Sequence, residues 1–141
     1  SYSTIEMFKC YDEIKSYNIN FDHIDLLSIK PLDIQKIYNS VKKTGKLIIF
    51  DNSSHKICSV ASEIVSSLVN INHKIFKVNP EILTLPDIHQ PTSFHLTKNY
   101  FISKQLLIST ILKICKKSKK LKKTNEIINH DITKDDKIFE Y

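Results

Sequence analysis

The first part of the chain carries an apolar residue at about every third position, which is the spacing of a helix packed on one side. The stripe runs from Thr4 to Tyr17, and Ser3 or Thr4 is expected to cap the helix. Its members are Ile5, Phe8, Tyr11 and Ile14. Residues 21–29 are rich in β-forming side chains and are followed by Pro31, so the pattern predicts a strand that ends before this proline.

A second helix is predicted over residues 34–43, where apolar residues return with a period of three and four. Asp33 precedes it and is expected to cap its first turn. Gly45 stands just past its end, where a left-handed helix stop belongs.

The run from Lys46 to Asp51 is short and almost continuously apolar, which is typical of a central strand covered on both faces. We expect residues 52–55 to form its exit loop and a third helix to occupy residues 56–69. A further strand is expected over residues 75–78.

Three of the four prolines lie between Pro80 and Pro91, and they predict an irregular loop. A last helix is expected from Lys104 to about Lys116. Alternating strands and helices with short links predict a three-layer α/β/α domain, whose mainly parallel (mixed) sheet has about five strands. This domain is expected to span residues 1–115, with its first strand truncated at the start, and residues 116–141 are expected to form a lysine-rich, flexible tail.

The net charge of +6 is concentrated toward the end of the chain, where residues 116–123 hold six lysines. Every basic residue is a lysine, so the bidentate arginine contacts favoured in sequence-specific DNA recognition are missing, and a nucleic-acid partner is not expected. The lysine run could still attract a phosphate-rich partner, the alternative being a solvated tail. No apolar run approaches the roughly 20 residues that a membrane span needs, so no membrane partner is expected.

The three cysteines are odd in number and widely spaced, which favours a reducing compartment: the mitochondrial matrix, a plastid or the bacterial cytoplasm. Cys10, Cys58 and Cys115 each fall on or beside an apolar stripe and are expected to be small buried hydrophobes.

Among the histidines, His55 is the strongest candidate for function, because it follows the central strand at the end of the sheet where α/β proteins tend to bind ligands. It is a candidate contact for an active-site mouth or an anion, or else an exposed loop histidine. Asp51, Ser53 and His55 have the residue types of a hydrolase triad, but residues so close in one loop rarely converge with an oxyanion hole. His89 and His95 lack a metal-site spacing, so no metal site is expected.

Aromatic residues near residue 100 are interleaved with few cations, which disfavours a base-stacking platform. Phe94, Tyr100 and Phe101 are instead candidates for a subunit interface or a cover for the sheet edge.

The segment Ile24–Asp33, followed by Val41–Asp51, resembles the carboxy-terminal domain of the transketolase-like thiamine enzymes. It is most similar to the beta subunits of pyruvate and branched-chain 2-oxo acid dehydrogenases (E1), in which an Ile-Asp-Leu strand, a Pro-x-Asp turn and a helix ending Lys-Lys-Thr-Gly precede an apolar strand closed by an acid. A second block matches the spacing of that subunit at Pro91, Ser93, Leu96, Tyr100 and Ser103. By this resemblance, residues 1–3 are the end of the first strand of the domain, and the chain is a fragment or a processed subunit.

The resemblance implies an assembly domain without catalytic, cofactor-binding or metal-binding residues of its own. The intact enzyme would decarboxylate a 2-oxo acid such as pyruvate and pass the acyl group to lipoamide, with thiamine diphosphate and Mg bound by other domains. The implied partners are the E1 alpha subunit, a second beta subunit and the acyltransferase (E2) core. Acidic residues contribute to docking that core, and Glu81 and Asp87 are the candidates here.

Two alternatives stay open. The domain could belong to a transketolase or a 1-deoxy-D-xylulose-5-phosphate synthase, or it could be a stand-alone module that binds an anionic partner through the lysine tail. The chain also departs from the family pattern, because residues 52–60 lack glycine, Thr97 replaces an acid and Ile102 replaces a proline.

Overall fold

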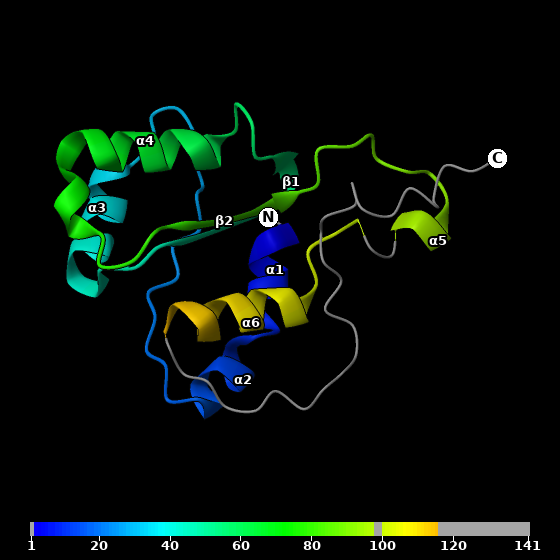
Figure 1. Ribbon diagram of the computed structural model, residues 1–141, viewed down its shortest axis with the longest axis horizontal. Coiled ribbons are helices and arrows are strands. Elements are labelled where there is room, and N and C mark those ends of the chain that lie inside the picture. Colours follow the sequence, from blue (N-terminus) through cyan, green and yellow to red (C-terminus); the bar gives the residue numbers. More distant parts are fainter. Residues whose placement is uncertain (1, 98–99, 116–141) are drawn as a thin grey trace.

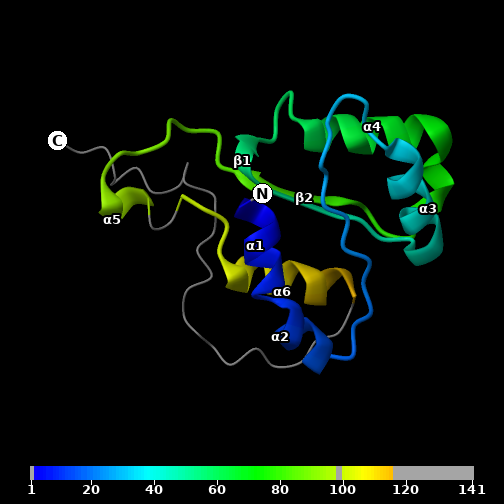
Figure 2. The ribbon, with the colours of Figure 1, turned by 180° about the vertical axis from the view of Figure 1, so that it is seen from behind.

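Two parallel strands lie between two groups of helices in the computed structural model, which describes residues 2–97 and 100–115 (Figure 1). The strands are β1 (Ile48–His55) and β2 (Glu81–Leu85). Helices α3 (Ile34–Thr44) and α4 (Val60–Asn72) cover one face of the pair, and α1 (Tyr2–Phe8), α2 (Tyr11–Ser16) and α6 (Lys104–Ile114) lie on the other, as the reverse view in Figure 2 also shows. The short elements are η1 (His73–Ile75) and α5 (Phe94–Thr97).

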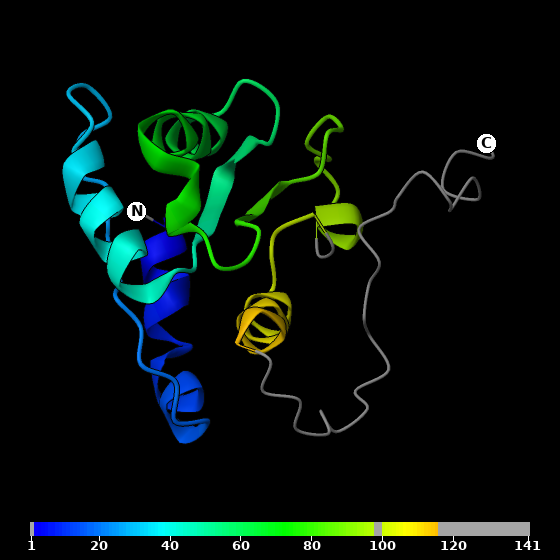
Figure 3. The ribbon, with the colours of Figure 1, turned by 60° about the vertical axis from the view of Figure 1, so that its left-hand side comes forward.

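Side chains of β1 alternate between two hydrophobic clusters, as the pleat of a strand requires. Ile48 and Phe50 pack against the first cluster, which centres on Cys10, Ile14 and the apolar face of α6. Leu47 and Ile49 pack against the second cluster, whose buried members are Ile37, Val41, Ile64, Leu68 and Ile75. Figure 3 shows this layering nearly end-on, with α6 and α4 on opposite sides of the strands. The predicted three-layer α/β/α arrangement and the parallel sheet are therefore confirmed, although the described residues contain two strands where about five were predicted.

The helix ends agree with the predicted ones where a capping residue fixes them. The Asp33 side chain accepts a hydrogen bond from Lys36 N at 3.0 Å, and Gly45 ends α3 in the left-handed region at φ 72°. Ser103 caps α6 in the same way, accepting from Leu106 N at 3.2 Å. Helix α4 begins at Val60 rather than near residue 56, because Ser59 accepts from Ser62 N and so fixes the first turn.

The predicted first helix is divided into α1 and α2, and only part of its predicted packed side is buried. Cys10 and Ile14 are buried, whereas Ile5 and Phe8 are each 56% exposed. Because α1 begins at Tyr2, neither Ser3 nor Thr4 caps it, and Tyr2 and Ser3 are helical instead of ending a strand.

The strand predictions failed where a strand depends on a distant partner. Residues 21–29 form no strand, because no backbone hydrogen bond joins them to β1 within the described part of the chain. Residues 52–55 continue β1 instead of leaving it, and residues 75–78 turn through η1 into a loop. The strand that pairs with β1 is β2, and it lies inside the predicted irregular loop, where Pro80 and Pro86 bound it on both sides.

The lysine-rich segment beyond residue 115 lies outside the described residues. Within the described ones, none of the helices has the length and apolar character to cross a bilayer.

Gly45→Ala is expected to lower the free energy of unfolding by about 1–2 kcal/mol, because an L side chain is strained at this φ. The new methyl group would also lie 2.5 Å from Cγ and Cδ of Lys77. Urea denaturation of Gly45→Ala, Lys77→Ala and the double variant separates the two effects. If the double variant is as stable as Lys77→Ala, steric conflict and not backbone strain sets the cost.

Candidate functional site

The carboxyl half of β1 is polar, and Asp51 forms a local Asx turn within it, where the register with β2 is irregular. Its carboxylate accepts hydrogen bonds from the backbone N of Ser53, at 2.9 Å, and from the hydroxyls of Ser53 and Ser54. Burial opposes ionisation of this carboxyl group, but the serine donors outweigh it, and the pKa of Asp51 lies below its ordinary value. The charge of Asp51 is therefore held by its own turn.

His55 ends β1 and faces the loop after β2. Its Nδ1 lies 2.7 Å from the carbonyl oxygen of Pro86, and since a carbonyl oxygen only accepts, Nδ1 carries a proton and donates. The Asp51 carboxylate accepts hydrogen bonds from Ser53 and Ser54, whereas His55 donates a hydrogen bond to Pro86 in the loop after β2. This arrangement is not the acid–histidine–nucleophile relay of a hydrolase.

His55, Asp87 and Tyr100 were predicted separately and line one hollow of about 360 Å³ at this end of the sheet. Asp87 and His89 are exposed on its loop side. Tyr100 is 3% exposed and forms part of the wall, so its ring is covered within this chain.

Asn52 joins this end of the sheet to a segment 50 residues further along the chain. Its side-chain oxygen accepts from Ile102 N at 2.9 Å, and its amide nitrogen donates to Ile102 O at 3.5 Å. Both partners are buried, and the pair fixes the chain directly after Tyr100 and Phe101. The sequence prediction placed Asn52 in an exit loop and missed this role, which no local pattern marks.

The remaining predicted site residues lie at the surface. Glu81 forms an ion pair with Lys113 of α6, with 3.1 Å between the charged atoms. Phe94 is 83% exposed on α5, and Phe101 is partly exposed between Tyr100 and Tyr2, with ring centroids 5.4 and 6.5 Å away.

The three cysteines differ in how far they are buried. Burial raises the pKa of the Cys10 thiol, as expected for a small buried hydrophobe, but Cys58 is exposed and Cys115 is partly exposed, which corrects the prediction for these two. His, Cys, Asp and Glu side chains form no group of three or more able to hold a metal ion within the ranges 2–97 and 100–115.

An apolar stripe on the outer face of α1 was not predicted as a surface feature. It consists of Tyr2, Ile5 and Phe8, each more than half exposed. We call these three residues the α1 stripe. Phe101, one of the residues predicted for an interface, adjoins the stripe through its ring contact with Tyr2.

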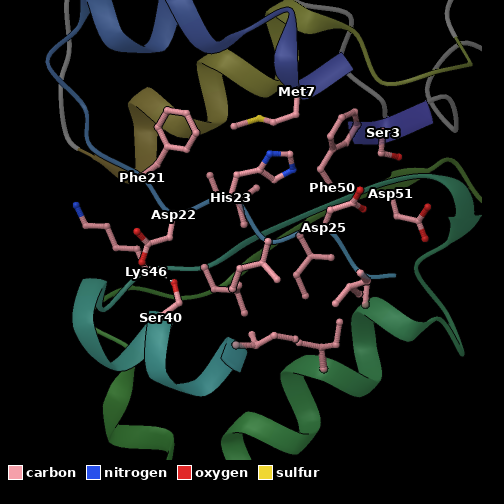
Figure 4. Close-up of a pocket in the computed structure, with 18 of the residues that line it drawn as sticks. Ser3, Met7, Phe21, Asp22, His23, Asp25, Ser40, Lys46, Phe50 and Asp51 are labelled. Atoms are coloured by element: carbon pink, nitrogen blue, oxygen red, sulfur yellow. Dashed lines mark hydrogen bonds between the residues drawn. The ribbon is translucent and has the colours of Figure 1, made fainter. Parts of the chain in front are cut away.

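A larger cavity of about 610 Å³ lies beside β1, between the strand and residues 19–26 (Figure 4). Met7, Phe21 and Phe50 give it apolar walls. Its polar rim includes Asp22, which accepts from Ser40 Oγ at 3.0 Å.

The amino-acid sequence of the chain matches a known family over most of its length. Residues 3–106 match the family described as "Transketolase, C-terminal domain". The pyruvate dehydrogenase E1 component subunit beta of Rickettsia bellii is 31% identical over 102 residues, which are 72% of this chain and 31% of that protein. The same subunit of Gracilaria tenuistipitata var. liui is 36% identical over 96 residues, which are 67% of this chain and 29% of that protein. The acetoin:2,6-dichlorophenolindophenol oxidoreductase subunit beta of Bacillus subtilis is 26% identical over 102 residues, which are 72% of this chain and 30% of that protein. The chain thus spans less than a third of the length of these relatives.

Asp51→Asn is expected to destabilise the fold most near neutral pH. Because the folded-state pKa lies below the unfolded value of about 3.9, the carboxylate stabilises the fold above about pH 5, and this contribution is lost as the pH falls through the folded pKa. Urea denaturation between about pH 3 and pH 7 should show the stability gap between the two proteins narrowing on acidification. Asp25→Asn, at an exposed position, is the control. A stability difference between the wild type and Asp51→Asn that stays constant over this pH range would contradict a lowered pKa for Asp51 in the folded state.

Asn52→Ala is expected to lower the free energy of unfolding by about 1–3 kcal/mol, because it leaves the buried N–H of Ile102 without a partner. The exposed Asn39, whose amide oxygen accepts a hydrogen bond from Gln35, provides the matched control, and its alanine variant should change stability by less than about 0.5 kcal/mol. If urea denaturation shows the same loss of unfolding free energy for the two variants, the hydrogen bonds between Asn52 and Ile102 do not contribute more than an exposed one.

Proposed function

Because the chain belongs to the transketolase C-terminal domain family, we propose that it is the assembly domain of the beta subunit of a thiamine-diphosphate-dependent pyruvate dehydrogenase E1 component. The observation that carries this proposal is the similarity of about two thirds or more of this chain to such subunits from several organisms. The intact enzyme would decarboxylate pyruvate and transfer the acyl group to lipoamide.

The outer surface of the domain supports an assembly role. The three residues of the α1 stripe are each more than half exposed, and Phe101 contacts the stripe at Tyr2. Exposed apolar area of this kind is typical of a surface that another subunit covers, because full burial of each large apolar side chain stabilises the complex by about 1.5–3 kcal/mol. We assign this area to contact with the E1 alpha subunit or a second beta subunit.

Thiamine diphosphate and magnesium belong, in this proposal, to parts of the enzyme outside this chain. The oxygens of Asp51 are occupied by the serines of its own turn. Within the residues the structure describes, no other acidic side chains gather into a ligand set for magnesium. In this proposal the chain contributes packing between subunits.

Asp87 is the better of the two candidates for docking the acyltransferase core. It is exposed on the loop after β2, whereas the charge of Glu81 is already paired with Lys113. An exposed carboxylate steers a basic partner more effectively than a paired one.

A second candidate function comes from the similarity to the Bacillus subtilis acetoin:2,6-dichlorophenolindophenol oxidoreductase subunit. The two candidates share the domain and differ in substrate. The intact subunit, purified with its alpha partner, should reduce an artificial electron acceptor with pyruvate and not with acetoin. The reverse preference would favour the second candidate, and tight thiamine diphosphate binding by residues 1–141 alone, measured by calorimetry, would contradict both.

Ile5→Ser in the intact subunit is expected to weaken subunit association about tenfold or more, because it removes apolar area from the α1 stripe. Leu27→Ser is the matched control, since Leu27 is 95% exposed and lies away from the stripe in sequence. Analytical ultracentrifugation over a range of concentrations measures the difference. Identical association of the two variants would remove the stripe from the interface.

A further inference from the structure

The hollow of about 360 Å³ beside His55 has a mainly polar lining. We call it the polar pocket, and its polar lining residues include Ser53, His55, Asp87, Gln90 and Tyr100. It lies where the parallel strands β1 and β2 both end, and the loop that runs from β2 toward α5 borders it (Figure 1). The carboxyl ends of parallel strands are where α/β domains usually bind ligands.

The Tyr100 hydroxyl opens onto this pocket. The residue is 3% exposed, and no hydrogen bond joins its hydroxyl to another residue in the described ranges. Among the described residues, every side-chain oxygen or nitrogen that is sealed from solvent has a partner, so this hydroxyl is not sealed. It therefore reaches the space of the pocket that the residue lines. A buried tyrosine usually gives its hydroxyl a hydrogen-bond partner, and here a ligand group would supply that partner.

Two further groups of the lining can only accept hydrogen bonds. His55 donates from Nδ1 to the Pro86 carbonyl oxygen at 2.7 Å, which leaves the lone pair of Nε2 as an acceptor in the neutral ring. The Ser53 hydroxyl gives its proton to the Asp51 carboxylate, so its oxygen also accepts and does not donate. A ligand that satisfies both groups must bring N–H or O–H donors.

The charge of the lining selects among such ligands. Asp87 contributes a carboxylate, which forms no ion pair with the described residues. Among the described residues that line the pocket there is no lysine, although the chain contains 21. Acceptors combined with a negative charge favour a cation that carries several N–H donors and disfavour a phosphate or a carboxylate. A metal ion is also disfavoured, because the described residues provide no group of three ligands for it.

The pocket also has an apolar part, formed by Leu85 and Ile88. Leu85 is buried at the end of β2, and Ile88 is exposed on the loop that follows. An alkyl chain attached to the cation would cover both side chains and gain from their removal from water.

We propose that the polar pocket binds a small aliphatic amine in its ammonium form. The three N–H donors of a primary ammonium group match the acceptors that the pocket offers at His55 Nε2, at the Tyr100 oxygen and at the Asp87 carboxylate. The inference is independent of the enzyme assignment. It also differs from docking of a protein at Asp87, because a partner that covers the exposed loop from outside does not need the hydroxyl of the buried Tyr100.

Three small probes test the chemistry of the ligand. n-Butylammonium, tetramethylammonium and butan-1-ol are titrated into the chain, and NMR follows the backbone amides of Ser53, His55 and Tyr100, which line the pocket. n-Butylammonium is expected to shift these amides saturably. Tetramethylammonium carries the charge without N–H donors and butan-1-ol carries the alkyl chain without the charge, so both are expected to bind at least about tenfold more weakly. Equal binding of either control probe, or no saturable shift with n-butylammonium, overturns the proposal.

Two conservative variants test the residues. Tyr100→Phe removes only the hydroxyl and is expected to weaken n-butylammonium binding about tenfold. Tyr38→Phe, at a partly buried tyrosine packed on the second cluster, is the matched control and should leave binding unchanged. Asp87→Asn is expected to weaken binding as well, and Asp25→Asn is its control. If Asp87→Asn weakens binding and Tyr100→Phe does not, the cation binds at the loop surface and the proposal fails.

A lysine side chain of another protein presents the same ammonium group, so a further probe distinguishes the two sources. Nα-acetyl-lysine methylamide carries this group at the end of a peptide-like backbone. Binding no tighter than that of n-butylammonium supports a small free amine as the ligand. Binding at least about tenfold tighter would assign the pocket to a protein side chain and overturn the proposal.

Discussion

The structure depends on β1 being covered on both faces by side chains that arrive from different parts of the chain. Successive residues of a strand point to opposite sides, so Ile48 and Phe50 need the cluster built on α6 while Leu47 and Ile49 need the one built on α3 and α4. A shift of one residue would exchange the two sets and leave neither cluster complete. The same constraint acts on the parallel register with β2, which is regular from Ile48 to Asp51 and shifts between Asp51 and His55.

Local chemistry explains which parts of this fold could be predicted from the sequence. Asp33, Gly45 and Ser103 act within one turn of the helix that they bound, so their positions in the sequence determine the ends of α3 and α6. A strand is different, because its backbone groups are satisfied by a partner that the local pattern does not identify. Residues 21–29 have strand composition but pair with no strand in the part of the chain that the structure describes, whereas β2 lies between two prolines that suggested a loop.

The same distinction applies to the candidate site. The family resemblance was available from the sequence, and so was the place of His55 after the central strand, because that place follows from the order of elements in an α/β domain. Asn52 was not, since its partner is Ile102 and no spacing rule connects an amide to a backbone group so far along the chain. Ile5 and Phe8 were predicted to lie on a packed face for a related reason: helical periodicity shows that one side is apolar, and only the surroundings show whether that side is covered.

The paired hydrogen bonds between Asn52 and Ile102 also bear on how this domain tolerates changes in length. The loop after β2 is anchored at its start by the strand and by the His55 contact with Pro86, and the chain is anchored again at Ile102. Residues added between these two anchors lengthen a closed loop, and each doubling of such a loop costs only about 0.6 kcal/mol of closure entropy. Evolution can therefore vary the length of this segment while Tyr100 and the last helix keep their places against the sheet.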